Sequence, residues 1–328
     1  MAEKAIISLD RVRGMFIGAF LGDALGVPHE FKCNRNVEYT GKLEHRGFMI
    51  TRFQGKKELE IGQISDDSEM TLTLLRSLIS NHGYNRDQVV LSYLQWANSG
   101  GWMMGKNTRE LLKGVTTVRG YQNRINKVLL LPMEQRSQSN GALMRSSPLA
   151  LLSDLNPVVL DVNITNPNDV CIDCEIVYIS ALRLALQGLP RNEIFRKIKD
   201  LAQTAEVKTI MSEVENRTFR NISENKGWCL HALWCSLTVL NSDMNCSEAM
   251  KWIITSQKGS DTDTNACISG ALLGAVSGFD NLNTESETKQ NIEILLNVDT
   301  EKGPTPRPRK YTPYDFYDIT LEAHKLTL

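Results

Sequence analysis

The sequence predicts an all-α protein, a single bundle of helices, and three observations support this fold class. Apolar residues recur at three- and four-residue spacing along most of the 328-residue chain, as they do in helices with one buried face. Alternating, strand-like stretches are few, and the chain has no βαβ rhythm and no fixed-period repeat. Two segments carry glycine or alanine at every fourth position, which is typical of helices that approach each other closely.

Apolar periodicity predicts most of the helices directly. The best strand-like stretch is 158–165, and 48–53 is a weaker one. The segment 302–313 is rich in proline and basic residues, so it predicts an extended crossing segment instead of a helix. The expected helices are 69–81, 86–96, 108–115, 171–186, 191–202, 228–240, 247–255 and 291–296.

Small residues in register mark two further helices. Each glycine inside a helix costs about 1 kcal/mol relative to alanine, so a row of them is tolerated only where backbones must come close. A membrane role is excluded because the apolar stretches 15–27 and 266–279 fall short of about 18 residues, and the first contains Asp23. We expect both helices at the centre of the bundle, packed closely on neighbours, with each other as one possible pair. The small residues are Gly14, Gly18, Gly22 and Gly26, and Ala266, Gly270, Gly274 and Gly278.

Bulk composition excludes some classes of partner. The 37 Lys and Arg against 38 Asp and Glu give a net charge of −1, so no basic field is available to hold a nucleic acid. The N-terminus has no apolar stretch typical of a signal peptide. Seven cysteines, an odd number scattered along the chain, fit a reducing compartment. We expect a cytoplasmic monomer forming one domain over 1–328, without a membrane partner.

An acidic pair opens the predicted helix at 69–81. Asp66 and Asp67 are adjacent, with a serine on each side. One interpretation is a capping box, with Asp66 as N-cap and Glu69 three residues later; an acidic first turn also suits the helix dipole. Capping does not require two adjacent carboxylates flanked by hydroxyls, so metal binding is the second interpretation.

A second acidic pair opens the later glycine-bearing helix. Asp261 and Asp263 alternate in a turn, so their side chains can converge on one cation. An EF-hand loop also begins D-x-D-x-N, but glycine is missing at Ala266 and the bidentate glutamate at Leu272. Helix capping by Asp263 alone is the other interpretation.

The two acidic pairs together indicate a hard-cation site. Four carboxylates with the hydroxyls of Ser65 and Thr264 are oxygen ligands that suit Mg²⁺, Mn²⁺ or Ca²⁺ and do not suit zinc. Four negative charges balance two divalent cations. A paired site of this kind can activate water and sugar hydroxyls.

Four blocks, taken in order, give the sequence a likeness to a known family. They are GDALG at 22–26 with Glu30 just after it, SDDSEM at 65–70, NGALMR at 140–145 and GSDTDT at 259–264, with the loop MGKNT at 104–108 between the second and third. The chain resembles the ADP-ribosylglycohydrolases over about 11–279. The remaining 280–328 are then C-terminal helices and the proline-rich crossing.

The resemblance implies an orthogonal helical bundle with a cleft that holds two Mg²⁺ ions, for which Mn²⁺ is a possible substitute. Glu30 matches a family glutamate near the ribose and is the candidate for general acid–base work, with a plain surface carboxylate as its alternative. Asp66 and Asp67 are implied to serve both metal binding and catalysis. The implied metal ligands are Ser65, Asp66, Asp67, Asp261, Asp263 and Thr264.

The third block and the loop before it are implied to receive the rest of ADP-ribose. A small-residue helix start is suited to a diphosphate. Arg145 has a structural ion pair as its alternative. Two departures stand out: Ser65 replaces the usual threonine, and Asn166 stands where the family often has histidine, which puts the contacts of that histidine in doubt. The implied substrate-binding residues are Gly105, Asn107, Asn140, Gly141, Ala142, Met144 and Arg145.

The resulting hypothesis is a Mg²⁺-dependent hydrolase that releases ADP-ribose from a modified protein or small molecule. The acceptor, arginine or serine among others, stays open. Two alternatives are a catalytically silent binder of ADP-ribose or a nucleotide, and a hydrolase of another ribosyl compound. Intact carboxylates at all four metal positions disfavour the silent binder, because buried carboxylates are costly without cations. The CxxC at Cys171 and Cys174 lies on a helical apolar pattern and is interpreted as core packing.

Overall fold

Helices make up nearly all of the regular structure. The computed structural model describes residues 6–32, 38–51, 55–100, 103–256, 259–284 and 286–328. Over these residues the chain forms fifteen α-helices, several 3₁₀ turns and one antiparallel two-stranded hairpin. The predicted all-α fold class is confirmed. None of the described helices is long and apolar enough to cross a membrane.

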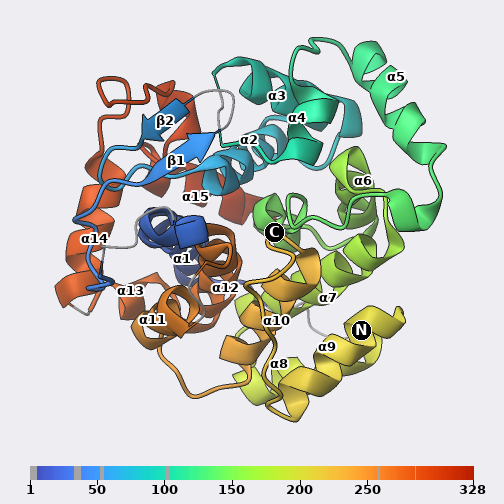
Figure 1. The fold of residues 1–328 in the computed structure, drawn as a ribbon. Coiled ribbons are helices and arrows are strands. Elements are labelled where there is room, and N and C mark those ends of the chain that lie inside the picture. Colours follow the sequence, from blue (N-terminus) through green and yellow to red (C-terminus); the bar gives the residue numbers. More distant parts are fainter. Residues whose placement is uncertain (1–5, 33–37, 52–54, 101–102, 257–258, 285) are drawn as a thin grey trace.

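The elements follow one another along the chain as a helical series interrupted once, near its start, by the hairpin (Figure 1). The hairpin pairs β1 with β2 in antiparallel register. The bounds are α1 Leu9–Gly26, β1 Phe48–Thr51, β2 Gly55–Glu58, α2 Asp66–Ser80, α3 Arg86–Asn98, α4 Lys106–Leu112, α5 Val118–Leu129, α6 Asn156–Thr165, α7 Asp169–Leu186, α8 Arg191–Ile198, α9 Ala205–Glu215, α10 Cys229–Leu240, α11 Cys246–Ser256, α12 Thr262–Ser277, α13 Phe279–Leu282, α14 Ser286–Asn297 and α15 Phe316–Lys325.

Helices α1 and α12 lie against each other in the interior, with other helices around them (Figure 1). Every residue of 14–26 is buried, and so is every residue of 262–275, as expected of helices that are covered on all sides. The two rows of small residues face each other. A Cβ placed on Gly18 would lie 2.2 Å from the carbonyl oxygen of Gly270, and one on Gly274 would lie 2.0 Å from that of Gly14. The prediction of close packing is confirmed, and the partners are the two glycine-bearing helices themselves.

One predicted strand is wrong, and one is partly confirmed. The segment 158–165 belongs to α6, because Pro157 lies in its first turn, where proline favours a helix start. Its β-branched residues alternate in sequence, yet Val158 and Val162 also lie four residues apart and are both buried on one helix face. In 48–53, β1 confirms the strand up to Thr51; the last two residues lie outside the described part.

Most of the helices predicted from periodicity are present with shifted ends. The missed helices include α5, which buries only Tyr121 and Ile125 and so gives a weak apolar signal. Helix α9 buries Val207, Ile210 and Val214 at regular helical spacing, and this pattern could have been recognised. The proline-rich segment holds no α-helix and only one 3₁₀ turn, at Arg309–Tyr311.

The glycine contact predicts a severe effect of Gly270→Leu. A Cβ on Gly270 would lie 2.1 Å from the carbonyl oxygen of Gly18, and backbone cannot move aside as a flexible side chain can. We expect a loss of at least about 3 kcal/mol in the free energy of unfolding, the upper end of ordinary overpacking, and no soluble expression. Gly105→Ala is the control, because a Cβ there meets nothing within 4 Å. A Gly270→Leu variant with the wild-type thermal midpoint would contradict the packing.

Candidate metal centre and substrate cleft

A cleft of about 670 Å³ opens between the starts of α2, α4 and α12 and the loops that face them. Its size is that of a site for a small organic ligand. One end of the cleft, which we call the metal end, is lined by Asp66, Asp67, Asp261 and Asp263, from the starts of α2 and α12. Segments far apart in the sequence, including parts of the second, third and fourth blocks, therefore line one cleft.

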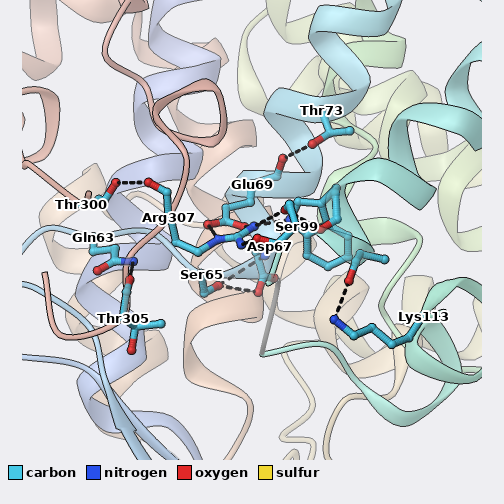
Figure 2. Close-up of polar contacts among 12 residues, drawn as sticks. Gln63, Ser65, Asp67, Glu69, Thr73, Ser99, Lys113, Thr300, Thr305 and Arg307 are labelled. Atoms are coloured by element: carbon cyan, nitrogen blue, oxygen red, sulfur yellow. Dashed lines mark hydrogen bonds and ion pairs between the residues drawn. The ribbon is translucent and has the colours of Figure 1, made fainter. Parts of the chain in front are cut away.

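The first acidic pair belongs to a helix start whose cap is a serine. Ser65 is the N-cap of α2, and its Oγ accepts a hydrogen bond from the Asp67 N–H at 3.3 Å. The same hydroxyl donates to Asp67 Oδ2 at 3.0 Å (Figure 2). The capping box led by Asp66 is wrong, because Asp66 lies inside the helix and the carboxylate of Glu69 binds elsewhere. Neither acidic residue of the pair is needed as the cap.

The second acidic pair also does little capping. Asp261 is the N-cap of α12 but makes no capping hydrogen bond with its side chain. Asp263 lies within the helix, where its Oδ1 accepts from the Thr264 N–H at 2.9 Å, so capping of the helix by Asp263 alone is wrong. Carboxylate oxygens of Glu30, Asp261 and Asp263 lie within 4.8 Å of one another, and all three residues are buried. Glu30 is thus not the plain surface carboxylate.

Negative charge is crowded in the buried end of the cleft. Burial is the main cause that raises the pKa of Glu30, Asp67 and Asp263 well above their usual values, and the neighbouring carboxylates add to it. Burial and the charges of Asp67 and Glu30 raise the pKa of Asp66 in the same way. Glu30 Oε2 and Asp67 Oδ1 are buried and have no hydrogen-bond partner. These oxygens are left open to a cation or a proton.

Asp23 is a supporting residue that the sequence analysis did not assign to the site. From the last turn of α1, its carboxylate accepts hydrogen bonds from the backbone N–H of Ser65 at 3.0 Å and of Ser68 at 3.1 Å. It therefore satisfies free N–H groups at the start of α2. Burial raises its pKa to about 6, opposed by these hydrogen bonds. An aspartate inside an apolar glycine helix was the signal that could have identified it.

Five of the predicted substrate-binding residues line the cleft. Asn140 also supports the metal end, because its Nδ2 donates to Asp261 Oδ2 at 2.9 Å. The Asn107 Nδ2 donates to the Thr165 carbonyl at 2.7 Å, which fixes the orientation of its amide. The five are Gly105, Asn107, Asn140, Gly141 and Met144.

Ala142 and Arg145 are buried and do not line the cleft. The Arg145 guanidinium pairs with Asp161 at 3.0 Å and donates to the Gly141 carbonyl at 2.7 Å. These contacts correspond to the structural ion pair that the sequence left open. Arg145 therefore supports the cleft wall from behind, through Gly141.

Asn166, which stands at the position of the family histidine, is also buried behind the cleft. Its Nδ2 donates to the Ser139 carbonyl at 3.1 Å and to the Ser139 Oγ at 3.0 Å. Its Oδ1 accepts from the Thr165 hydroxyl at 2.8 Å. Because Ser139 lines the cleft, Asn166 holds the loop that carries one wall.

The rim of the metal end is formed by residues that the sequence analysis missed. Phe31 follows Glu30 with φ +48°, in the left-handed region, and is 37% exposed. The Lys226 Nζ lies 5.2 Å from the centre of its ring. A Cβ on Gly227 would lie 3.3 Å from Asp261 Oδ2, so the backbone passes close to that carboxylate. No pattern in the sequence marks these rim contacts.

Comparison with known proteins identifies the family. A model of the ADP-ribosylglycohydrolase family matches residues 4–295. The chain belongs to the ADP-ribosylglycohydrolase family. It is 28% identical over 298 residues to a putative ADP-ribosyl glycohydrolase of Acanthamoeba polyphaga mimivirus, covering 81% of this chain and 86% of the viral protein. It is 24% identical over 303 residues to the ADP-ribosyl-[dinitrogen reductase] glycohydrolase of Rhodospirillum rubrum, covering 88% and 96%.

The fold agrees with that of a solved ADP-ribosylglycohydrolase structure. The chain superposes on a chain of an ADP-ribosylglycohydrolase-related protein complex with a TM-score of 0.72, covering 98% of this chain and 99% of that one at 19% identity. The resemblance expected from the four blocks is confirmed. Membership of the ADP-ribosylglycohydrolases supports hydrolysis of ADP-ribose linkages as the class of activity.

The buried carboxylates predict how stability changes with pH. A carboxyl group whose pKa is higher in the folded than in the unfolded state binds its proton more tightly when the chain is folded. The stability that this gives at low pH is lost as the pH rises through the pKa of the folded state. For Asp23 this loss runs from about pH 4 to about pH 6, and the other raised groups extend it upward. In EDTA, we expect the thermal midpoint to fall between about pH 5 and pH 8. Mg²⁺ should raise the thermal midpoint more at pH 8 than at pH 5. An equal rise at pH 5 and pH 8 would contradict this prediction.

Proposed function

We propose that the chain hydrolyses the glycosidic bond between ADP-ribose and an acceptor with the help of two divalent cations, Mg²⁺ or, in its place, Mn²⁺. The observation that carries the proposal is the convergence of buried carboxylates from α2, α12 and Glu30 at one end of a ligand-sized cleft. Water would add to the sugar carbon of the scissile bond, and the acceptor would leave with a proton.

The residues present fit such cations. The buried oxygens Glu30 Oε2 and Asp67 Oδ1 have no hydrogen-bond partner. An all-oxygen set of ligands is the one that Mg²⁺ prefers. When bound, the cations would polarise ribose hydroxyls and water and neutralise the carboxylates. The residues that would hold them are Ser65, Asp66, Asp67, Asp261, Asp263 and Thr264.

Other residues would orient the substrate and move a proton. Glu30 lies next to Asp261 and Asp263 and has a raised pKa, so it is suited to give a proton to the leaving group or take one from water. The cleft wall that includes Asn107 and Gly141 would receive the diphosphate and adenosine. The substrate is then an ADP-ribosylated protein or small molecule.

The silent-binder alternative is disfavoured by the same carboxylates. A binder has no need of buried like charges, because each costs stability when no cation is present. The odd number of cysteines, seven in the chain, is consistent with a reducing compartment. On this ground we propose a cytoplasmic location. We also propose that the chain forms one domain and is monomeric.

The test of the function is release of free ADP-ribose from ADP-ribosyl-arginine and ADP-ribosyl-serine peptides, with Mg²⁺ and with EDTA. We expect metal-dependent release from one of them, since the carboxylates cannot act without neutralisation. Product identification by mass spectrometry also separates this reaction from hydrolysis of another ribosyl compound. No release from either peptide, with ADP-ribose still bound, would favour the silent binder.

Asp67→Asn and Asp261→Asn test the assignment of the metal end. Each removes one negative charge from a crowded buried cluster, so we expect loss of activity by at least about 100-fold together with a higher thermal midpoint in EDTA. The Mg²⁺-induced rise in the midpoint should shrink. Asp87→Asn, in the first turn of α3, is the control. Normal turnover by either variant with metal present would contradict the assignment of these residues as metal ligands.

A further inference from the structure

Arg307 is a buried charge that the proposed reaction does not use. It lies between α14 and α15, beyond the residues 4–295 that match the family model, and is 1% exposed. Its guanidinium binds both oxygens of Glu69, from Nε to Oε1 at 2.8 Å and from Nη2 to Oε2 at 2.7 Å (Figure 2). Bidentate contacts of this kind are among the strongest between side chains.

The Glu69 carboxylate is fixed from a second side as well. Trp96 on α3 donates its indole N–H to Glu69 Oε2 at 2.7 Å. Arg307 is itself anchored, because its Nη1 donates to the Ser99 carbonyl at 2.9 Å. Neither partner of the buried ion pair is free to turn away from the other.

Glu69 connects this ion pair to the metal end. Its backbone N–H donates to the Ser65 carbonyl at 3.1 Å and so closes the first turn of α2. Asp66 lies three residues earlier, on the same side of the helix, and the charge of Glu69 contributes to raising its pKa. Without Arg307, Glu69 would be one more uncompensated carboxylate beside the cluster.

The segment that carries Arg307 is also tied to the chain just before α2. The Arg307 N–H donates to the Thr300 carbonyl at 3.1 Å, which closes the segment into a loop. The Gln63 side chain donates to the Thr305 carbonyl at 3.1 Å (Figure 2). The loop therefore contacts the chain on both sides of Ser65.

We propose that Arg307 is a positioning residue for the metal end: by fixing and neutralising Glu69, it holds the first turn of α2 with Asp66 and Asp67 in the geometry that binds cations. The inference rests on the proposed metal-dependent function. It gives the proline-rich segment a role in the site, although that segment lies outside the cleft.

The test compares Mn²⁺ binding by calorimetry for the whole chain and its variants, with folding checked by circular dichroism. Arg307→Gln should weaken Mn²⁺ affinity by about 10- to 100-fold, as loss of a residue that supports metal ligands does. Arg307→Lys keeps the charge but not the bidentate fork, so it should lose less. In both variants, the Mg²⁺ concentration needed for half-maximal activity should rise, in line with the weaker Mn²⁺ binding.

Arg76→Gln is the matched control. Arg76 joins the same helix to the C-terminal part through a bidentate pair with Asp315, at 2.6 and 2.8 Å, but lies nine residues after Asp67, about 13 Å along α2. The Arg76→Gln variant should be less stable than the wild-type chain but keep wild-type Mn²⁺ affinity. Wild-type affinity in Arg307→Gln, or an equal loss in Arg76→Gln, would overturn the positioning role.

A second variant covers the case in which Arg307→Gln does not fold. The double change of Glu69→Gln with Arg307→Met removes both buried charges, which is better tolerated than leaving one unpaired. This double variant should fold, and its Mn²⁺ affinity should be lower than that of the wild-type chain. Wild-type Mn²⁺ affinity in the double variant would overturn the inference. If the wild-type chain binds neither Mn²⁺ nor Mg²⁺, the proposed function fails as well, which distinguishes the two failures.

Discussion

The close contact of α1 with α12 is the constraint on which the rest of the structure depends. Because glycine faces glycine, the backbones approach closely enough for Gly26 to lie against the backbone of Asp263. The same contact places Asp23 where it satisfies the start of α2. Helix packing therefore brings the parts of the metal end together. The buried backbones of α1, α2 and α12 hold the residues that carry its carboxylates in place.

Three acidic side chains at or next to the metal end, Asp67, Asp261 and Glu69, each have a neutral or positive hydrogen-bonding neighbour. Asn140 donates to Asp261, and Ser65 donates to Asp67. Arg307 neutralises Glu69 one turn along the helix. These contacts keep the carboxylates oriented, and in the proposed function the cations would relieve their mutual repulsion.

The sequence was informative where chemistry and periodicity are local. Buried stripes predicted helices such as α2 and α7, and the spacing of small residues predicted the central pair. The β-branched residues of α6 produced a wrong strand, because alternation and helical spacing coincide over eight residues. The string NGALMR could not show that Arg145 points away from the cleft. The roles of Asp23 and Arg307 depend on partners 42 and 238 residues away, and no local pattern encodes such contacts.

The glycine-to-glycine contact also limits how this chain can vary. Every amino acid other than glycine carries a Cβ, so no missense change at Gly14, Gly18, Gly270 or Gly274 is conservative. A compensating change would have to move a whole helix, since no side chain at the contact can adopt another rotamer. Sequence drift is therefore directed to the outer helices and the cleft rim, where side chains can change without disturbing the centre.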